Sequence, residues 1–255
     1  MSTSSLAARM RAGETVFGTM IAESFSPGIC RTVKAAGFDF IIIDTEHSLA
    51  GIETCAWMIR AGRDIGLAVI IRAPAFEGQW LNRYLDLGAN GLLIPRIEDG
   101  DTCRAIVDTI KYPPVGIRGL GTVAGHSDYD PPPTPELVTW ANENLVLAVQ
   151  IETQKGLDNR QEILSVPGVD ALFIGPNDLS LSMGYPGGLD HPAVLKAMDD
   201  IVQTAKDCGV APGMHVFDMP GAKKWLAAGA KFLAYSSDLA FIHSAGKAAL
   251  AELKG

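Results

Sequence analysis

The stretch Val149–Asp178, VQIETQKGLDNRQEILSVPGVDALFIGPND, decides how the rest of the chain is interpreted. An apolar run, LVLAVQI, ends at Glu152, a helical segment follows, and a second apolar run, ALFIG, ends at Pro176-Asn177-Asp178. Two buried-strand patterns therefore each deliver a carboxylate to the edge where parallel α/β folds bind ligands. Adjacent carboxylates repel each other unless a cation lies between them or they share a proton. We interpret Glu152 and Asp178 as metal ligands; alternatively, both are loop acids that cap helices.

Apolar runs of strand length alternate with helical patterns along the whole chain. Most of the runs lack polar alternation, which is typical of parallel strands covered on both faces. The predicted strands are Val16–Ile21, Asp39–Ile43, Ala68–Ile71, Gly91–Ile94, Leu145–Ile151, Ala171–Ile174, Ala211–Val216 and Phe232–Tyr235. The predicted helices are Pro27–Ala36, Gly51–Ile65, Gln79–Leu87, Asp101–Ile110, Gly156–Leu164, Pro192–Asp207, Met219–Ala228 and Leu239–Leu253.

Eight such units in 255 residues predict a single-domain α/β fold, a (β/α)8 TIM barrel over residues 1–255. A doubly wound sheet is the alternative, but the chain lacks the GxGxxG turn that such folds use for nucleotides. No repeat, low-complexity segment or linker divides the sequence.

Composition and charge exclude several classes of function. The net charge of −8 disfavours nucleic-acid binding and docking to an anionic membrane, because both need a basic face. The N-terminus has no apolar signal region, and no apolar run is long enough to span a bilayer. None of the four cysteines forms a CxxC pair, so we expect buried, reduced thiols in a soluble cytoplasmic protein.

Further polar residues follow the second and third predicted strands. IIIDTEHS places Asp44, Glu46 and His47 at one strand end, and IIRAP places Arg72 at the next. A histidine there can act as a general base that a carboxylate orients, or it is merely exposed. An arginine there can bind a carboxylate or an oxyanion, or it pairs with a neighbouring acid.

Together with the two acids of the opening stretch, this group fits a site that forms an enolate from a 2-oxo acid. A metal would act as a Lewis acid, Arg72 would add positive charge and His47 would move protons. Imine chemistry would instead need a lysine inside the barrel mouth. Lys155 is the only nearby candidate in the sequence, because Lys231 starts a strand.

The connection Lys111–Thr134, KYPPVGIRGLGTVAGHSDYDPPPT, is unusually long and rich in glycine and proline. Long irregular loops in compact domains are usually functional. We therefore predict a wall or lid over the site, with a surface excursion or subunit contact as the alternative.

Five motifs resemble the HpcH/HpaI aldolase family, and the similarity covers nearly the whole chain. They are GFDFIIIDTEHS, LGANGLLIPRIED, YPPVGIRG, VQIETQKGLDN and GVDALFIGPNDLSLSMGYPG. The resemblance implies a class II aldolase that cleaves 4-hydroxy-2-oxo acids to pyruvate and an aldehyde and runs the reverse addition through a metal-stabilised pyruvate enolate. It also implies a homo-oligomer, often a hexamer built as a trimer of dimers, with the last helix exchanged between neighbours.

Several site roles follow from this resemblance alone. Glu152 and Asp178 match the ligands of Mg²⁺, Mn²⁺ or Co²⁺, and Arg72 matches the arginine at the substrate's keto oxygen. His47 matches the catalytic base, with Asp44 as its hydrogen-bond partner. The remaining matches are Asp86, which reaches a neighbouring subunit's histidine, and the pocket-lining Gln150, Pro176, Asn177 and Asp178.

Two segments depart from the family pattern. The first strand, VFGTMIAES, lacks the tryptophan that members commonly carry, and the loop LGTVAGHSDYD contains an unusual His126. Both regions face the acceptor aldehyde in the family, so the sequence leaves the aldehyde open. The rival functions are a CoA-ester lyase of the citrate lyase type on a similar barrel and a non-catalytic 2-oxo acid sensor.

Overall fold

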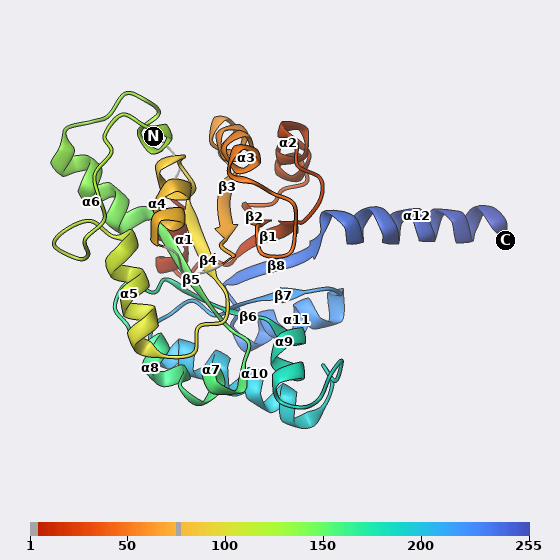
Figure 1. The fold of residues 1–255 in the computed structure, drawn as a ribbon. Coiled ribbons are helices and arrows are strands. Elements are labelled where there is room, and N and C mark those ends of the chain that lie inside the picture. Colours follow the sequence, from red (N-terminus) through yellow and green to blue (C-terminus); the bar gives the residue numbers. More distant parts are fainter. Residues whose placement is uncertain (1–4, 75–77) are drawn as a thin grey trace.

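Eight parallel strands close into one barrel in the computed structural model, which describes residues 5–74 and 78–255 (Figure 1). Each strand pairs with the next one in the chain, and the last pairs with the first. This closed order confirms the predicted (β/α)8 barrel over the alternative of a doubly wound sheet. The strands are β1 (Val16–Ile21), β2 (Phe40–Asp44), β3 (Ala68–Arg72), β4 (Gly91–Ile94), β5 (Val146–Ile151), β6 (Ala171–Ile174), β7 (Gly213–Val216) and β8 (Phe232–Ser237).

Helices surround the barrel, and the predicted ones are present with small changes at their ends. The sequence pattern did not predict α1, α6 or α9, and the structure has two short helices, α7 and α8, where one was predicted. The helices that follow are α1 (Leu6–Arg11), α2 (Pro27–Ala35), α3 (Ile52–Asp64), α4 (Gly78–Asp86), α5 (Gly100–Ile110), α6 (Thr134–Asn144), α7 (Gln154–Asp158), α8 (Arg160–Leu164), α9 (Pro176–Ser182), α10 (Pro192–Asp207), α11 (Met219–Ala228) and α12 (Asp238–Lys254).

The core has two layers, as expected when a strand is buried on both faces. Alternate side chains of β2, such as Ile41 and Ile43, pack outward against the helices, while Phe40 and Ile42 fill the barrel interior. Leu6 and other apolar side chains of α1 join the inner layer. Because the barrel is filled, polar side chains gather at its mouth, where the strands end.

The loop after α5 packs at the end of the barrel opposite that mouth. Arg118 donates a hydrogen bond to Asp86 at the end of α4, and Arg63, near the end of α3, binds Asp128 at 2.7 Å. The barrel helices run antiparallel to the strands, so both helix ends lie at the N-terminal face. The loop Lys111–Thr134 therefore does not cover the site of its own chain, and the prediction of a wall or lid there is wrong.

The last helix, α12, extends away from the barrel (Figure 1). Its residues from Phe241 onward are exposed, including Ile242, Leu250 and Leu253. None of the helices in residues 5–74 and 78–255 is long and apolar enough to cross a membrane.

Asp238, the first residue of α12, fastens that helix to the segment after β1. Its carboxylate accepts hydrogen bonds from the backbone N–H groups of Ala22, Glu23 and Ser24 at 3.0, 3.0 and 2.6 Å. Burial by itself raises the pKa of Asp238, but these donors outweigh burial and hold the pKa below its ordinary value. The charged form of this side chain therefore stabilises the fold.

Asp238→Ala should lower the free energy of unfolding at pH 7 by about 2–3 kcal/mol, since it removes hydrogen bonds to a charged group. The stabilisation is present above the ordinary aspartate pKa of about 3.9 and disappears as the pH falls through the lower folded-state pKa. Urea titrations at pH 7 and below pH 4 measure both effects. Asp101→Ala, at an exposed carboxylate on α5, is the control. Equal losses at the two pH values would show that the charge does not matter.

Candidate functional site

The neighbouring ends of β2 and β3 hold an ion pair. In the parallel register Asp44 lies opposite Arg72, and both side chains are buried. Arg72 Nε donates to Asp44 Oδ1 at 2.9 Å and Nη2 donates to Oδ2 at 2.5 Å. Burial by itself raises the pKa of Asp44, but the hydrogen bonds and charge of Arg72 hold it below its ordinary value. This bidentate ion pair fixes the plane of the guanidinium at the barrel mouth.

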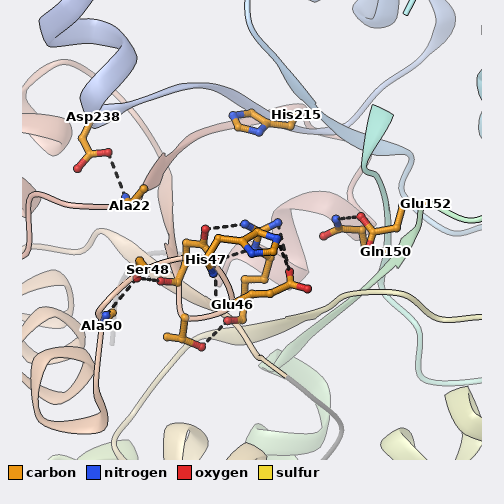
Figure 2. A network of polar contacts seen from close by, with 12 residues as sticks. Ala22, Glu46, His47, Ser48, Ala50, Gln150, Glu152, His215 and Asp238 are labelled. Atoms are coloured by element: carbon orange, nitrogen blue, oxygen red, sulfur yellow. Dashed lines mark hydrogen bonds and ion pairs between the residues drawn. The ribbon is translucent and has the colours of Figure 1, made fainter. Parts of the chain in front are cut away.

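Glu46 and His47 follow β2 on the same rim (Figure 2). Glu46 Oε2 lies 3.5 Å from Arg72 Nη1 and 3.7 Å from His47 Nε2, and the His47 side chain is 65% exposed. Asp44 accepts from the backbone N–H of His47, whereas the imidazole faces Glu46. The structure therefore gives His47 a different carboxylate neighbour from the expected Asp44. Sequence reasoning named Glu46 but gave it no role.

Glu152, just past β5, is a buried carboxylate. Its Oε1 accepts from the backbone N–H of Arg96 at 2.9 Å, and its Oε2 accepts from Gln150 Nε2 (Figure 2). Burial, together with the charge of Asp178, raises the pKa of Glu152 to about 7 although the Gln150 hydrogen bond opposes the shift. A side chain at Gly175 would overlap this carboxylate, which explains a glycine at the end of β6.

A pocket at the mouth unites several predicted site residues. Its walls come from strand ends on opposite sides of the barrel and from the start of α9. The pocket is lined by Met20, Arg72, Gln150, Phe173, Gly175, Pro176, Asn177, Asp178, His215 and Phe217. The structure therefore brings Gln150 and Pro176–Asp178 together around one pocket, and it adds His215, which sequence reasoning missed.

The polar groups around Glu152 fit a divalent cation. Glu152 and Asp178 are close enough for the charge of Asp178 to act on Glu152, and a cation between them would relieve that repulsion. Gln150 Oε1 is buried and lacks a hydrogen-bond partner within residues 5–74 and 78–255. No group of three or more His, Cys, Asp or Glu side chains in those residues is arranged to hold a metal. Two carboxylates with open positions suit Mg²⁺, which retains water and substrate ligands.

Three other candidate site residues lie outside this pocket. Asp86 pairs with Arg118 at the N-terminal face, so it reaches no histidine of its own chain's site. His126 is also at that face, with Nδ1 3.4 Å from the Asp86 carbonyl oxygen. Lys155 is exposed and lies 3.5 Å from Glu98, outside the pocket lining, which disfavours imine chemistry.

Known proteins resemble this chain in sequence over most of its length. The family model described as HpcH/HpaI aldolase/citrate lyase matches residues 19–245. A 4-hydroxy-2-oxo-heptane-1,7-dioate aldolase of Shigella sonnei is 33% identical over 96% of this chain and 92% of its own length. A hydroxypyruvate/pyruvate aldolase of Deinococcus radiodurans is 35% identical over 92% of this chain and 83% of its own.

A solved structure is similar over nearly the whole fold. The crystal structure of an HpcH/HpaI aldolase from Desulfitobacterium hafniense superposes with a TM-score of 0.94 and 31% identity, over 99% of this chain and 97% of that one. The family match covers far more than half of the residues, and the aligned span includes both carboxylates of the pocket region. The chain belongs to the HpcH/HpaI aldolase/citrate lyase family.

Proposed function

We propose that this protein is a divalent metal-dependent aldolase. It cleaves a 4-hydroxy-2-oxo acid to pyruvate and an aldehyde, and it catalyses the reverse addition. The observation that carries the proposal is the buried carboxylate of Glu152, whose charged form is disfavoured by burial and by the charge of Asp178, a residue that lines the pocket together with Arg72. The aldolase names of the relatives favour this reaction over cleavage of a CoA ester.

Glu152 and Asp178 would hold Mg²⁺, Mn²⁺ or Co²⁺, with Gln150 Oε1 as a nearby polar group. When bound, the cation supplies Lewis-acid stabilisation of negative charge on the 2-oxo group. Arg72 lines the same pocket, and Asp44 fixes its guanidinium. Its charge is therefore already oriented toward the substrate oxygens before the reaction starts.

His47 moves the protons in this proposal. In cleavage the imidazole, directly or through water, takes the proton from the 4-hydroxyl while the C3–C4 bond breaks and the aldehyde forms. The bonding electrons pass to the 2-oxo group, and a proton is then returned to C3 to complete pyruvate. Glu46 Oε2 lies 3.7 Å from Nε2 and is the carboxylate that would orient the imidazole for these transfers.

The working enzyme is proposed to be a cytoplasmic homo-oligomer, a hexamer formed as a trimer of dimers. The exposed apolar side chains of α12 support exchange of this helix with a neighbour, since it has little contact with its own barrel beyond its first turn. Asp86 would then approach the histidine of a second subunit, which fits its position away from its own chain's site.

Metal-stripped protein provides the test of this function. It should cleave 4-hydroxy-2-oxo acids, and join pyruvate to members of an aldehyde panel, only after Mg²⁺, Mn²⁺ or Co²⁺ is added. A CoA ester should not be cleaved. Full activity that persists after EDTA treatment would contradict the metal requirement, and cleavage of a CoA ester alone would favour the rival lyase.

His47→Ala should slow the exchange of pyruvate methyl protons with solvent by about 10²–10⁴-fold, the usual contribution of a positioned general base. Proton NMR in deuterated water measures this exchange without any aldehyde. Pyruvate affinity should stay unchanged, because the exposed imidazole is not part of the pocket wall. Exchange at the wild-type rate would remove His47 as the base.

A further inference from the structure

The proposed mechanism leaves His215 without a role, although this side chain lines the site pocket. Met214 and Val216, its neighbours on β7, are buried in the outer core between barrel and helices. Because successive strand residues point to opposite faces, His215 points to the barrel interior. In Figure 2 its imidazole lies apart from both the Glu46–His47 cluster and the Gln150–Glu152 pair.

One ring nitrogen of His215 has a fixed role. Nε2 lies 2.9 Å from the carbonyl oxygen of Ser236, and a carbonyl oxygen only accepts hydrogen bonds, so Nε2 carries the hydrogen. Ser236 has a left-handed backbone with φ of 59°, at the point where the register of β8 against β1 shifts. The Ser236 carbonyl oxygen also accepts a hydrogen bond from Thr19 Oγ1. Two side chains, rather than a neighbouring strand, therefore donate to this carbonyl at the irregular strand end.

The second nitrogen, Nδ1, is consequently an acceptor. Burial lowers the pKa of His215, and the charge of Arg72 lowers it further, so the ring is neutral near pH 7. With the hydrogen on Nε2, Nδ1 has a free lone pair. Within residues 5–74 and 78–255, the His215 ring forms its one hydrogen bond through Nε2, to Ser236.

The rest of the pocket combines polar and apolar groups. Arg72 offers donors, Gln150 and Asp178 offer further acceptors, and Met20, Phe173 and Phe217 form apolar walls. The imidazole packs against Phe217 with ring centroids 4.3 Å apart, which restrains its orientation. A substrate methyl group beside Nδ1 would leave the lone pair unpaired, whereas a hydroxyl would donate to it.

We propose that His215 is a specificity-determining residue that selects a hydroxylated substrate by accepting a hydrogen bond at Nδ1. The inference rests on the proposed aldolase function and narrows its substrate class. The hydroxyl belongs either to the 2-oxo acid, at the carbon next to its carbonyl, or to the acceptor aldehyde. In both cases the deoxy analogue fits the same space without that hydrogen bond.

Two comparisons distinguish a hydroxyl on the 2-oxo acid from one on the aldehyde. Each comparison is made with the wild type, with His215→Leu and with His215→Asn. Calorimetry with Mn²⁺ present gives the ratio of the affinities for 3-hydroxypyruvate and pyruvate. Kinetics with pyruvate as donor give the ratio of kcat/KM for glycolaldehyde and acetaldehyde. The leucine variant should lower one of these ratios about tenfold, the value of one neutral hydrogen bond. The asparagine variant, with an amide oxygen near the Nδ1 position, should retain part of the preference.

The ratio that changes identifies the reactant that carries the hydroxyl. Equal losses for the hydroxylated and deoxy compounds would leave both ratios unchanged. That result would give His215 only a structural role and overturn the inference while leaving the aldolase function intact. Failure of the wild type to bind either 2-oxo acid, with no aldol addition, would contradict the proposed function and this inference together.

Discussion

Replacing Glu152 by glutamine is expected to abolish metal-dependent turnover. The substitution keeps the shape of the side chain but removes the negative charge that a divalent cation needs. Loss of a residue that merely orients a metal ligand costs about 10–100-fold in affinity or activity. Loss of the ligand itself should therefore weaken Mn²⁺ binding by more than about 100-fold. Calorimetric titration of the stripped protein measures this affinity independently of catalysis.

The substitution also separates charge from folding. Because burial and Asp178 make the Glu152 carboxylate unfavourable in the absence of a cation, Glu152→Gln should unfold no more easily than the metal-free wild type. Glu136→Gln, at an exposed position on α6, is the matched control and should bind Mn²⁺ normally. Mn²⁺ affinity equal to that of the wild type in Glu152→Gln would remove this residue from the metal site.

Arg72→Lys should reduce kcat by about 10²–10³-fold, the usual cost of losing one contact to developing negative charge. Lysine keeps the positive charge beside Asp44, but it cannot reproduce the two parallel hydrogen bonds at 2.9 and 2.5 Å. Steady-state cleavage of a 4-hydroxy-2-oxo acid measures the loss.

The choice of lysine rather than alanine matters for this experiment. Arg72→Ala would leave Asp44 as an unpaired buried carboxylate, which typically costs about 3–5 kcal/mol of stability and would confuse catalysis with folding. Arg104→Lys, at an exposed arginine of α5, is the control and should retain full activity. A kcat for Arg72→Lys close to that of the control would show that the guanidinium does not act on the reacting oxygens.

The barrel is predictable from sequence because parallel strands covered on both faces leave continuous apolar runs, such as FIII before Asp44. The missed helix α6 begins in PPPTPELV and buries only Leu137 and Ala141, so it has little apolar periodicity to detect. The missed α9 starts within the PND sequence, which was interpreted only as a ligand loop.

The site is partly predictable for the same reason of topology. Strand ends place Arg72 and Asp178 in one pocket with Glu152 near both, and parallel pairing puts Asp44 directly opposite Arg72. The position of the loop after α5 also follows from topology. Each helix runs back along the barrel and ends at the N-terminal face, so a loop that follows a helix starts there. The lid prediction considered the length of that loop and overlooked this direction.

The inward direction of His215 could have been predicted from the sequence. The run GMHV was treated as one apolar strand, although its alternation puts Met214 and Val216 outward and the histidine inward. The hydrogen bond that orients its ring depends on the left-handed backbone of Ser236, which no pattern in YSSD predicts.

A crystal soaked with Mn²⁺ and pyruvate tests the central claim most directly. Anomalous scattering locates the manganese, and the same map shows the 2-oxo acid. We expect one manganese ion that contacts the carboxylates of Glu152 and Asp178, with pyruvate beside it within reach of Arg72. Manganese bound elsewhere, or a bound pyruvate with no metal between these two carboxylates, would contradict it.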